Sequence, residues 1–139
     1  MSHQSEAILE SNLIKQLLSL GYESVKIHDG NAFVSNLKTQ LEVFNKTRFT
    51  AKEFDAILNH LAKGTVFDKA KTLRDRFVLN KEDGTSFYVR FFNNEDWSQN
   101  KYQVTNQVQV QGSFMNQYDV TILVNGLPLV QIELKRSGI

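Results

Sequence analysis

The sequence predicts a single α+β domain in which a mixed β-sheet is flanked by helices. Apolar residues recur at helical spacing through the first half of the chain, whereas alternation with a period of two residues and hairpin turn signals dominate from residue 76 onward. Helices followed by strands are typical of the α+β class. A length of 139 residues and a hydrophobic fraction of 41% suffice for one core, so we expect one domain spanning residues 1–139.

Three helices are expected in the first half of the chain. The first begins at Ser5, a favoured capping residue, and ends at Gly21, and the second spans 32–45. The third begins with a capping box, in which the side chains of Thr50 and Glu53 each accept a hydrogen bond from the other residue's backbone N–H. The three apolar stripes are Leu9, Leu13, Leu17 and Leu20; Phe33, Leu37, Leu41 and Phe44; and Phe54, Ile57, Leu58 and Leu61.

Six strands follow from alternation and turn signals. The dipeptide Asp83-Gly84 separates two strand-like segments and is typical of a hairpin turn. The last two strands are the most apolar in the chain. The expected strands are 22–27, 76–79, 86–92, 103–111, 118–124 and 129–134.

Composition excludes several classes of protein. The chain has no cysteine and only three scattered histidines, so neither a disulfide framework nor a zinc site of thiolate ligands is expected. It has neither the apolar run of roughly 18–20 residues that a membrane helix needs nor the layout of a signal peptide, which fits a cytoplasmic protein. A net charge of +1 gives little support for nucleic-acid binding, although a local basic patch remains compatible with it.

The last two strands carry three charged residues on one face. Side chains of a strand alternate between its faces, so one face of the two strands carries only apolar residues: Val120, Ile122 and Val124, then Val130, Ile132 and Leu134. Charges within strands of this quality are costly unless they pair, bind a metal or face water. The opposite face carries Asp119, Thr121, Leu123, Gln131, Glu133 and Lys135.

The pairing of these two strands tests this arrangement. Residues that pair across two strands lie on the same face of the sheet. A two-residue turn at Asn125-Gly126 alone would pair Asp119 with Ile132, which belongs to the apolar face, so the charged and apolar sets would not stay separate. We therefore expect either a loop of odd length centred on Gly126 or a bulge in one strand. Asp119 would then lie opposite Glu133, close enough for both carboxylates to bind one cation.

These residues suit the cleavage of phosphodiesters. A hard cation neutralises phosphate charge and lowers the pKa of an attacking water, and Mg²⁺ takes one or two carboxylates as ligands. Asp119 and Glu133 supply the carboxylates, the carbonyl of Leu134 is a further candidate ligand, and Lys135 can stabilise charge in the transition state. The alternative is a solvated strand face, since a Glu and a Lys two residues apart are common.

The segment from Tyr118 to Arg136, YDVTILVNGLPLVQIELKR, closely resembles the N-terminal nuclease domain of the restriction (R) subunit of type I restriction-modification enzymes. This resemblance implies a PD-(D/E)xK restriction-endonuclease-like core and Mg²⁺-dependent cleavage of double-stranded DNA, with Mn²⁺ as a substitute. It assigns catalysis to Asp119, Glu133 and Lys135, and metal binding to the first two. In related nucleases a glutamate of the first helix lies near the metal; Glu6 and Glu10 are candidates, with helix capping as the alternative.

The resemblance also implies that these residues are the N-terminal fragment of a larger subunit, truncated at the C-terminus. The family continues with ATP-driven motor domains, which are absent here, and the chain has no Walker A sequence. ATP would therefore bind elsewhere in the parent subunit. Partners would be double-stranded DNA and the modification (methyltransferase) and specificity subunits, and we expect the isolated fragment to cut DNA weakly or not at all.

Two other functions remain open at this point. One is a different nuclease of the PD-(D/E)xK type, and the other is a catalytically silent interaction module. A basic cluster beside Phe67 and Phe77 could contact DNA phosphates, although a solvated surface is the commoner explanation. The cluster consists of Lys69, Lys71, Arg74 and Arg76.

Overall fold

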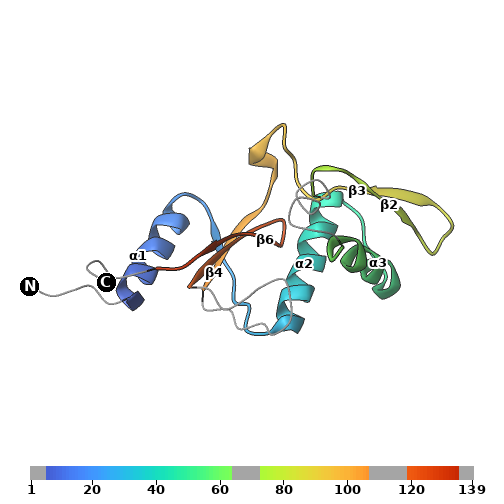
Figure 1. Ribbon diagram of the computed structural model, residues 1–139. Helices are drawn as coiled ribbons and strands as arrows, with labels where there is room; N and C mark the ends of the chain where they lie inside the picture. The colour runs from blue at the N-terminus through green and yellow to red at the C-terminus, as the bar shows by residue number, and fades with distance from the viewer. Residues whose placement is uncertain (1–5, 64–72, 107–118, 135–139) are drawn as a thin grey trace, which may run out of the picture. The chain divides into compact units, whose positions relative to one another are not determined.

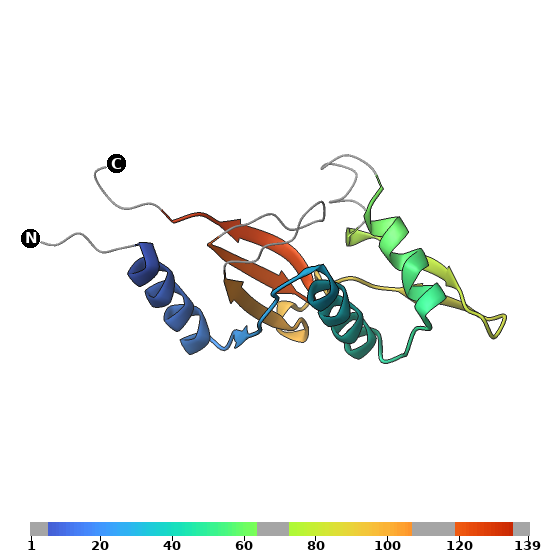
Figure 2. The same ribbon diagram turned by 90° about the horizontal axis from the view of Figure 1, so that it is seen from below.

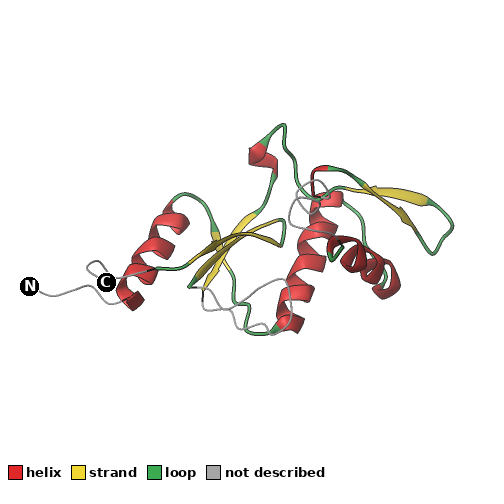
Figure 3. Cartoon of the chain, in the orientation of Figure 1, coloured by secondary structure: helices red, strands yellow, loops and turns green. Residues whose placement is uncertain are grey.

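The computed structural model describes residues 6–63, 73–106 and 119–134. Their elements are coloured along the chain in Figure 1 and by type in Figure 3. They are α1 (Glu6–Ser19), β1 (Glu23–Ser24), α2 (Gly30–Asn45), α3 (Ala51–Leu61), β2 (Phe77–Asn80), β3 (Ser86–Val89), the 3-10 helix η1 (Trp97–Gln99), β4 (Tyr102–Asn106), β5 (Val120–Val124) and β6 (Leu127–Ile132).

The described residues form two compact units. The sheet unit comprises residues 6–36, 102–106 and 119–134, and the hairpin unit comprises 37–63 and 73–101. Helix α2 begins in the first unit and continues into the second. The expectation of a single domain stays a prediction. Among the described residues, no helix combines the length and the apolar character needed to cross a membrane.

The sheet unit contains a mixed four-stranded sheet with the order β1-β4-β5-β6. Strand β1 pairs with β4 in parallel, and the other two pairings are antiparallel. With three α-helices among the described residues, this architecture confirms the predicted α+β class. The expected first strand, 22–27, is shorter than predicted and covers only Glu23–Ser24. Tyr22 N–H donates instead to the Leu17 carbonyl at the end of α1 (3.1 Å).

Helix α1 packs against one face of this sheet, as Figure 2 shows. Part of the predicted leucine stripe forms the contact: Leu17 is buried with Val104 of β4 and Val120 of β5, whereas Leu20, the last leucine of that stripe, is 74% exposed. Val120, Ile122 and Ile132 thus lie on the face that packs on α1, as the alternation predicted, whereas Val130 is 45% exposed. The residues that surround this cluster are Leu13, Ile14, Tyr22, Ile122, Ile132 and Leu134.

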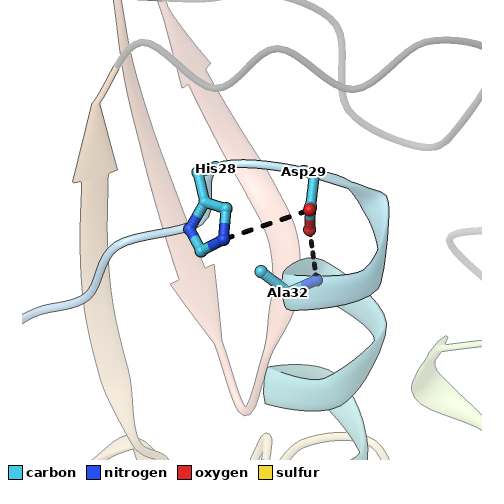
Figure 4. Close-up of polar contacts among 3 residues, drawn as sticks. All are labelled: His28, Asp29 and Ala32. Carbon is cyan, nitrogen blue, oxygen red and sulfur yellow. Dashed lines mark hydrogen bonds and ion pairs between the residues drawn. The ribbon is translucent and has the colours of Figure 1, made fainter.

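The opposite face of the sheet contacts the first turns of α2. The side-chain amides of Asn36 and Gln103 donate to each other's carbonyl oxygens, at 3.0 and 3.2 Å, and Gln103 is buried. Asp29 precedes this helix and accepts a hydrogen bond from Ala32 N–H at 2.8 Å (Figure 4). Since Asp29 is the cap, α2 begins at Gly30, two residues earlier than predicted.

The hairpin unit joins the second part of α2 to α3 and the β2–β3 hairpin. The hairpin turn at Asp83-Gly84 is confirmed, with Gly84 at φ +90°. His60 of α3 stacks on Phe77 of β2 with ring centroids 4.2 Å apart, and burial and the charge of Lys63 lower the pKa of His60. The apolar residues buried in this unit include Leu41, Ile57, Leu79 and Val89.

The predicted capping box is also confirmed, and its glutamate has a second role. Glu53 accepts one hydrogen bond from Thr50 N–H (2.9 Å) and another from Glu82 N–H (2.7 Å) in the turn after β2. These two N–H donors lower the pKa of the Glu53 carboxyl below its ordinary value. Glu53 therefore connects the start of α3 to the β2–β3 hairpin.

Replacing Glu53 by glutamine should lower the melting temperature at pH 7, because one of the two acceptors becomes an NH₂ donor facing an N–H. Since the pKa of Glu53 is lower in the folded state, its stabilisation is complete above its ordinary pKa of 4.5 and is lost as pH falls through the folded-state value. The difference in melting temperature between wild type and variant should therefore be largest at pH 7 and should shrink as pH falls further below 4.5. The matched control is Asp55→Asn, at an exposed carboxylate of the same helix; a difference that stays constant as pH falls would contradict this account.

Candidate metal centre

The turn between β5 and β6 has two residues, Asn125 and Gly126. Both have positive φ angles, +52° and +86°, and Val124 pairs with Leu127 across the turn. Such turns match the right-handed twist of the strands that they join. The loop of odd length was therefore a wrong prediction, and β6 begins at Leu127, two residues before the expected start.

A bulge in β6 keeps the charged residues of the two strands on one face, which the two-residue turn alone would not do. Leu123 pairs with Pro128, but the next residue of β5, Ile122, pairs with Val130, so Leu129 is an extra residue in β6. Pro128 has no N–H for the sheet ladder, and proline within sheets is typically found at edges and bulges. The prediction of a bulge in one strand is confirmed.

The bulge determines which residues of the two strands face each other beyond it. Thr121 pairs with Gln131, and Val120 pairs with Ile132. Continuing this register by one residue puts Asp119 opposite Glu133. The Asp119 carboxylate accepts a hydrogen bond from Leu134 N–H at 2.7 Å, which joins the start of β5 to the chain just after β6. By this register the two residues lie opposite each other at one end of the hairpin, and their binding of one cation stays a prediction.

The two carboxylates differ in their surroundings. Asp119 is partly buried and Glu133 is exposed. The Leu134 N–H occupies one acceptor position on Asp119 Oδ2, and a carboxylate has about four such positions, so Asp119 retains the capacity to bind a cation. Lys135, the third predicted catalytic residue, lies outside the described residues. The role of the Leu134 carbonyl as a ligand stays a prediction.

The donor set fits a magnesium ion. Within residues 6–63, 73–106 and 119–134, no group of three or more His, Cys, Asp or Glu side chains is placed to hold a metal. Mg²⁺ does not need such a group, because it commonly binds one or two carboxylates and completes its octahedron with water and substrate phosphate. Asp119 and Glu133 would be those two carboxylates.

Glu10 of α1 lies at the same end of the sheet but over its other face. Asn106 Nδ2 donates a hydrogen bond to Glu10 Oε2 at 3.0 Å, and Asn106 pairs with Val120 across β4 and β5. By alternation, Asn106 shares the face of Val104, which packs on α1, whereas Asp119 belongs to the opposite face. The proximity of Glu10 or the exposed Glu6 to a metal stays a prediction.

The sequence did not reveal a buried polar layer next to the carboxylates. Thr105 and Thr121 pair across β4 and β5 on the face of Asp119, and both are buried. Thr121 Oγ1 makes no hydrogen bond to any residue that the structure describes. In the sequence, the only indication of this buried layer was Thr121, which lies between the apolar residues Val120 and Ile122.

The basic cluster is described only in part. Arg76 lies over the ring of Tyr88, with its guanidinium carbon 4.8 Å from the ring centroid, and Arg74 Nε lies 3.6 Å from Asp75 Oδ1. These residues line a shallow hollow of about 400 Å³ in the hairpin unit. Lys69 and Lys71 lie outside the described residues.

Residues 3–139 match the family model described as the type I restriction enzyme R protein N terminus. The chain belongs to this family. The family resemblance of the segment 118–136 is thereby confirmed, and it extends over nearly the whole sequence, including residues 30–100.

Relatives from several bacteria are named as endonuclease subunits of type I restriction enzymes. The chain is 42% identical over 144 residues to the type I restriction enzyme SauCOLORF180P endonuclease subunit of Staphylococcus aureus strain COL. It is also 42% identical to the SsaAORF53P endonuclease subunit of Staphylococcus saprophyticus. Both alignments cover 100% of this chain and 16% of the relative. For the EcoprrI endonuclease subunit of Escherichia coli, the identity is 37% over 99% of this chain and 46% of the relative. The chain thus spans about a sixth of the length of the staphylococcal relatives.

Proposed function

We propose that this chain is the nuclease domain of a type I restriction enzyme R subunit and cleaves double-stranded DNA with the aid of Mg²⁺. The observation that carries the proposal is the bulged register, which, continued by one residue, puts Asp119 opposite Glu133 at one end of the hairpin. A PD-(D/E)xK core is part of this proposal. Relatives named as endonuclease subunits of type I restriction enzymes support the class of reaction.

The three residues share two roles in the proposed reaction. Asp119 and Glu133 would hold the cation. Bound there, a divalent cation would neutralise phosphate charge and lower the pKa of the attacking water. The Leu134 N–H orients Asp119 through their 2.7 Å hydrogen bond, so that its free lone pairs keep a fixed direction. Lys135 follows Glu133 by two residues and would stabilise negative charge on the phosphate during cleavage.

The remaining partners would belong to a larger, cytoplasmic assembly. In this proposal the modification and specificity subunits recognise the DNA, and ATP binds in other parts of the R subunit. Arg74 and Arg76 are exposed and suit contacts with phosphates, while Asp75 partly offsets their charge. We expect the isolated chain to cut weakly or not at all.

Replacing Asp119 by asparagine tests this function in the R subunit that carries the domain, assembled with its partner subunits and ATP. Asparagine keeps an oxygen that can accept the Leu134 N–H but loses the charge that attracts the cation, so we expect cleavage of plasmid DNA to fall by about a hundredfold or more. The assay compares Mg²⁺ with a chelator. Asp55→Asn, at an exposed carboxylate of α3, is the matched control and should cut like the wild type. Undiminished cutting by Asp119→Asn would contradict the proposal and favour a catalytically silent module.

A further inference from the structure

The β2–β3 hairpin has one face that packs on α3 and one face that is open. Phe77 stacks on His60 of α3, and Leu79 is buried, so these two strand residues define the packed face. By alternation the cross-strand pair Val78 and Tyr88 belongs to the other face, and their exposed fractions are 51% and 55%. A valine and a tyrosine that pair on an open face indicate a contact surface and not a part of the core.

Two arginines border this open face. Arg74 and Arg76 line the shallow hollow of about 400 Å³ together with Val78, Tyr88 and one carboxylate, that of Asp75. Both arginines are exposed, so solvent and ligands can reach their guanidinium groups. Two arginines and one aspartate leave the lining with a net positive charge. The hollow therefore suits an anionic ligand that also offers apolar surface.

Tyr88 supports Arg76 without using its hydrogen-bond donors. The guanidinium carbon of Arg76 lies 4.8 Å from the centroid of the Tyr88 ring. A cation–π contact engages the flat face of a guanidinium group, so its N–H donors, which point outward in the plane, stay available to a ligand. Asp75 Oδ1 lies 3.6 Å from Arg74 Nε, so this carboxylate pairs with Arg74 and not with Arg76. A guanidinium fork held in this way matches the geometry of a phosphate group.

We propose that the open face of the hairpin, formed by Arg74, Arg76, Val78 and Tyr88, binds the sugar–phosphate backbone of double-stranded DNA. The identity of the ligand rests on the proposed function. The arginines bind phosphate oxygens, and the apolar surface of Val78 and Tyr88 contacts the sugars. Contacts of this kind read no bases, so the binding is independent of DNA sequence. The hairpin unit thus holds the DNA, and the sheet unit carries the candidate metal centre.

The test follows the fluorescence anisotropy of a short labelled duplex titrated with this chain, in a buffer with a chelator so that metal binding plays no part. In about 0.1 M salt Arg76→Ala should bind about eightfold more weakly, and the slope of log affinity against log salt should fall by about 0.9, the share of one phosphate contact. Tyr88→Leu keeps the charge of Arg76 but removes the ring beneath it, so binding should weaken by about two- to fivefold with the slope unchanged.

Arg48→Ala is the matched control, because it removes an equal charge from the same unit. Arg48 is exposed and lies at the other end of β2, where its carbonyl accepts a hydrogen bond from Lys81 Nζ at 3.0 Å. This variant should bind the duplex like the wild type. A second duplex of equal length and unrelated sequence should bind with the same affinity.

Three results would overturn the inference. The folded wild-type chain might leave the duplex unbound at about 0.1 mM protein, which is the weak end of ordinary non-specific DNA binding. Arg76→Ala and Arg48→Ala might weaken binding equally, which would assign the effect to the charge of the whole chain. A clear preference for one duplex would show that the contact reads bases.

A Mn²⁺ titration of the same proteins separates this surface from the metal centre. Arg76→Ala should bind Mn²⁺ like the wild type, because the arginine belongs to the other unit. If the wild type binds no Mn²⁺ but Arg76→Ala still weakens DNA binding, the metal centre is wrong and the DNA-binding surface stands.

Discussion

Replacing Lys135 by alanine in the full-length subunit is expected to reduce DNA cleavage by about 100- to 1,000-fold, while ATP hydrolysis continues at its normal rate. Lys135 lies outside the described residues, so the reason comes from the sequence. It follows Glu133 by two residues, and strand alternation predicts that both lie on one face. A cation at this point would stabilise the charge that develops on the phosphate. Plasmid cleavage and ATP hydrolysis, measured on the same preparation, check the prediction.

The control for Lys135→Ala is Lys52→Ala, at an exposed lysine of α3. It should leave both activities unchanged, since it removes an equal charge far along the sequence from the hairpin. A purely structural role for Lys135 predicts another pattern, in which the variant has a lower melting temperature and cleavage and ATP hydrolysis fall together. That pattern would contradict a catalytic role.

Replacing either Asp119 or Glu133 by alanine is expected to abolish Mn²⁺ binding by this chain at millimolar concentration, as followed by calorimetry. Mg²⁺ and Mn²⁺ prefer oxygen ligands, and each variant removes one of the two carboxylates proposed to bind the cation. The two variants should differ in stability. Asp119→Ala also leaves the Leu134 N–H without its acceptor and should lower the melting temperature, whereas Glu133 is exposed and its removal should not.

Glu133→Ala is therefore the cleaner of the two variants, because a loss of metal binding cannot be attributed to a weaker fold. Asp55→Ala, at an exposed carboxylate of the hairpin unit, should bind Mn²⁺ like the wild type. Full binding by Glu133→Ala would show that a cation in this chain does not use both carboxylates.

The sequence predicted an element correctly where a single local interaction or a single buried face determines that element. The capping box needs only Thr50 and Glu53, which are three residues apart, and it is present as predicted. The alternation in β5 and β6 needs only a buried face, and α1 supplies it at Val120 and Ile132. Such features depend on neighbours in sequence or on one packed surface.

The sequence could not decide between a loop of odd length and a bulge in the β5–β6 hairpin. Either one keeps the charged residues of both strands on the same face. The structure combines a two-residue turn with a bulge at Leu129. Proline within a strand usually argues against regular pairing, but it is tolerated next to a bulge.

The buried polar residues on the two faces of the sheet could not be predicted, because their partners come from distant parts of the chain. Gln103 is buried through its amide pair with Asn36, 67 residues away, and Glu10 is held by Asn106, 96 residues away. In the sequence each of these residues is an ordinary polar residue of a helix or strand. Only the packing of α1 and α2 on the two faces of the sheet decides which of them are buried.

The most direct test of a shared metal site is anomalous diffraction from crystals of this chain soaked in Mn²⁺. We predict one anomalous peak at the end of the β5–β6 hairpin, with carboxylate oxygens of both Asp119 and Glu133 about 2.1 Å from it. A peak bound to only one of these carboxylates, or a fully ordered hairpin with no peak at this position, would contradict the account.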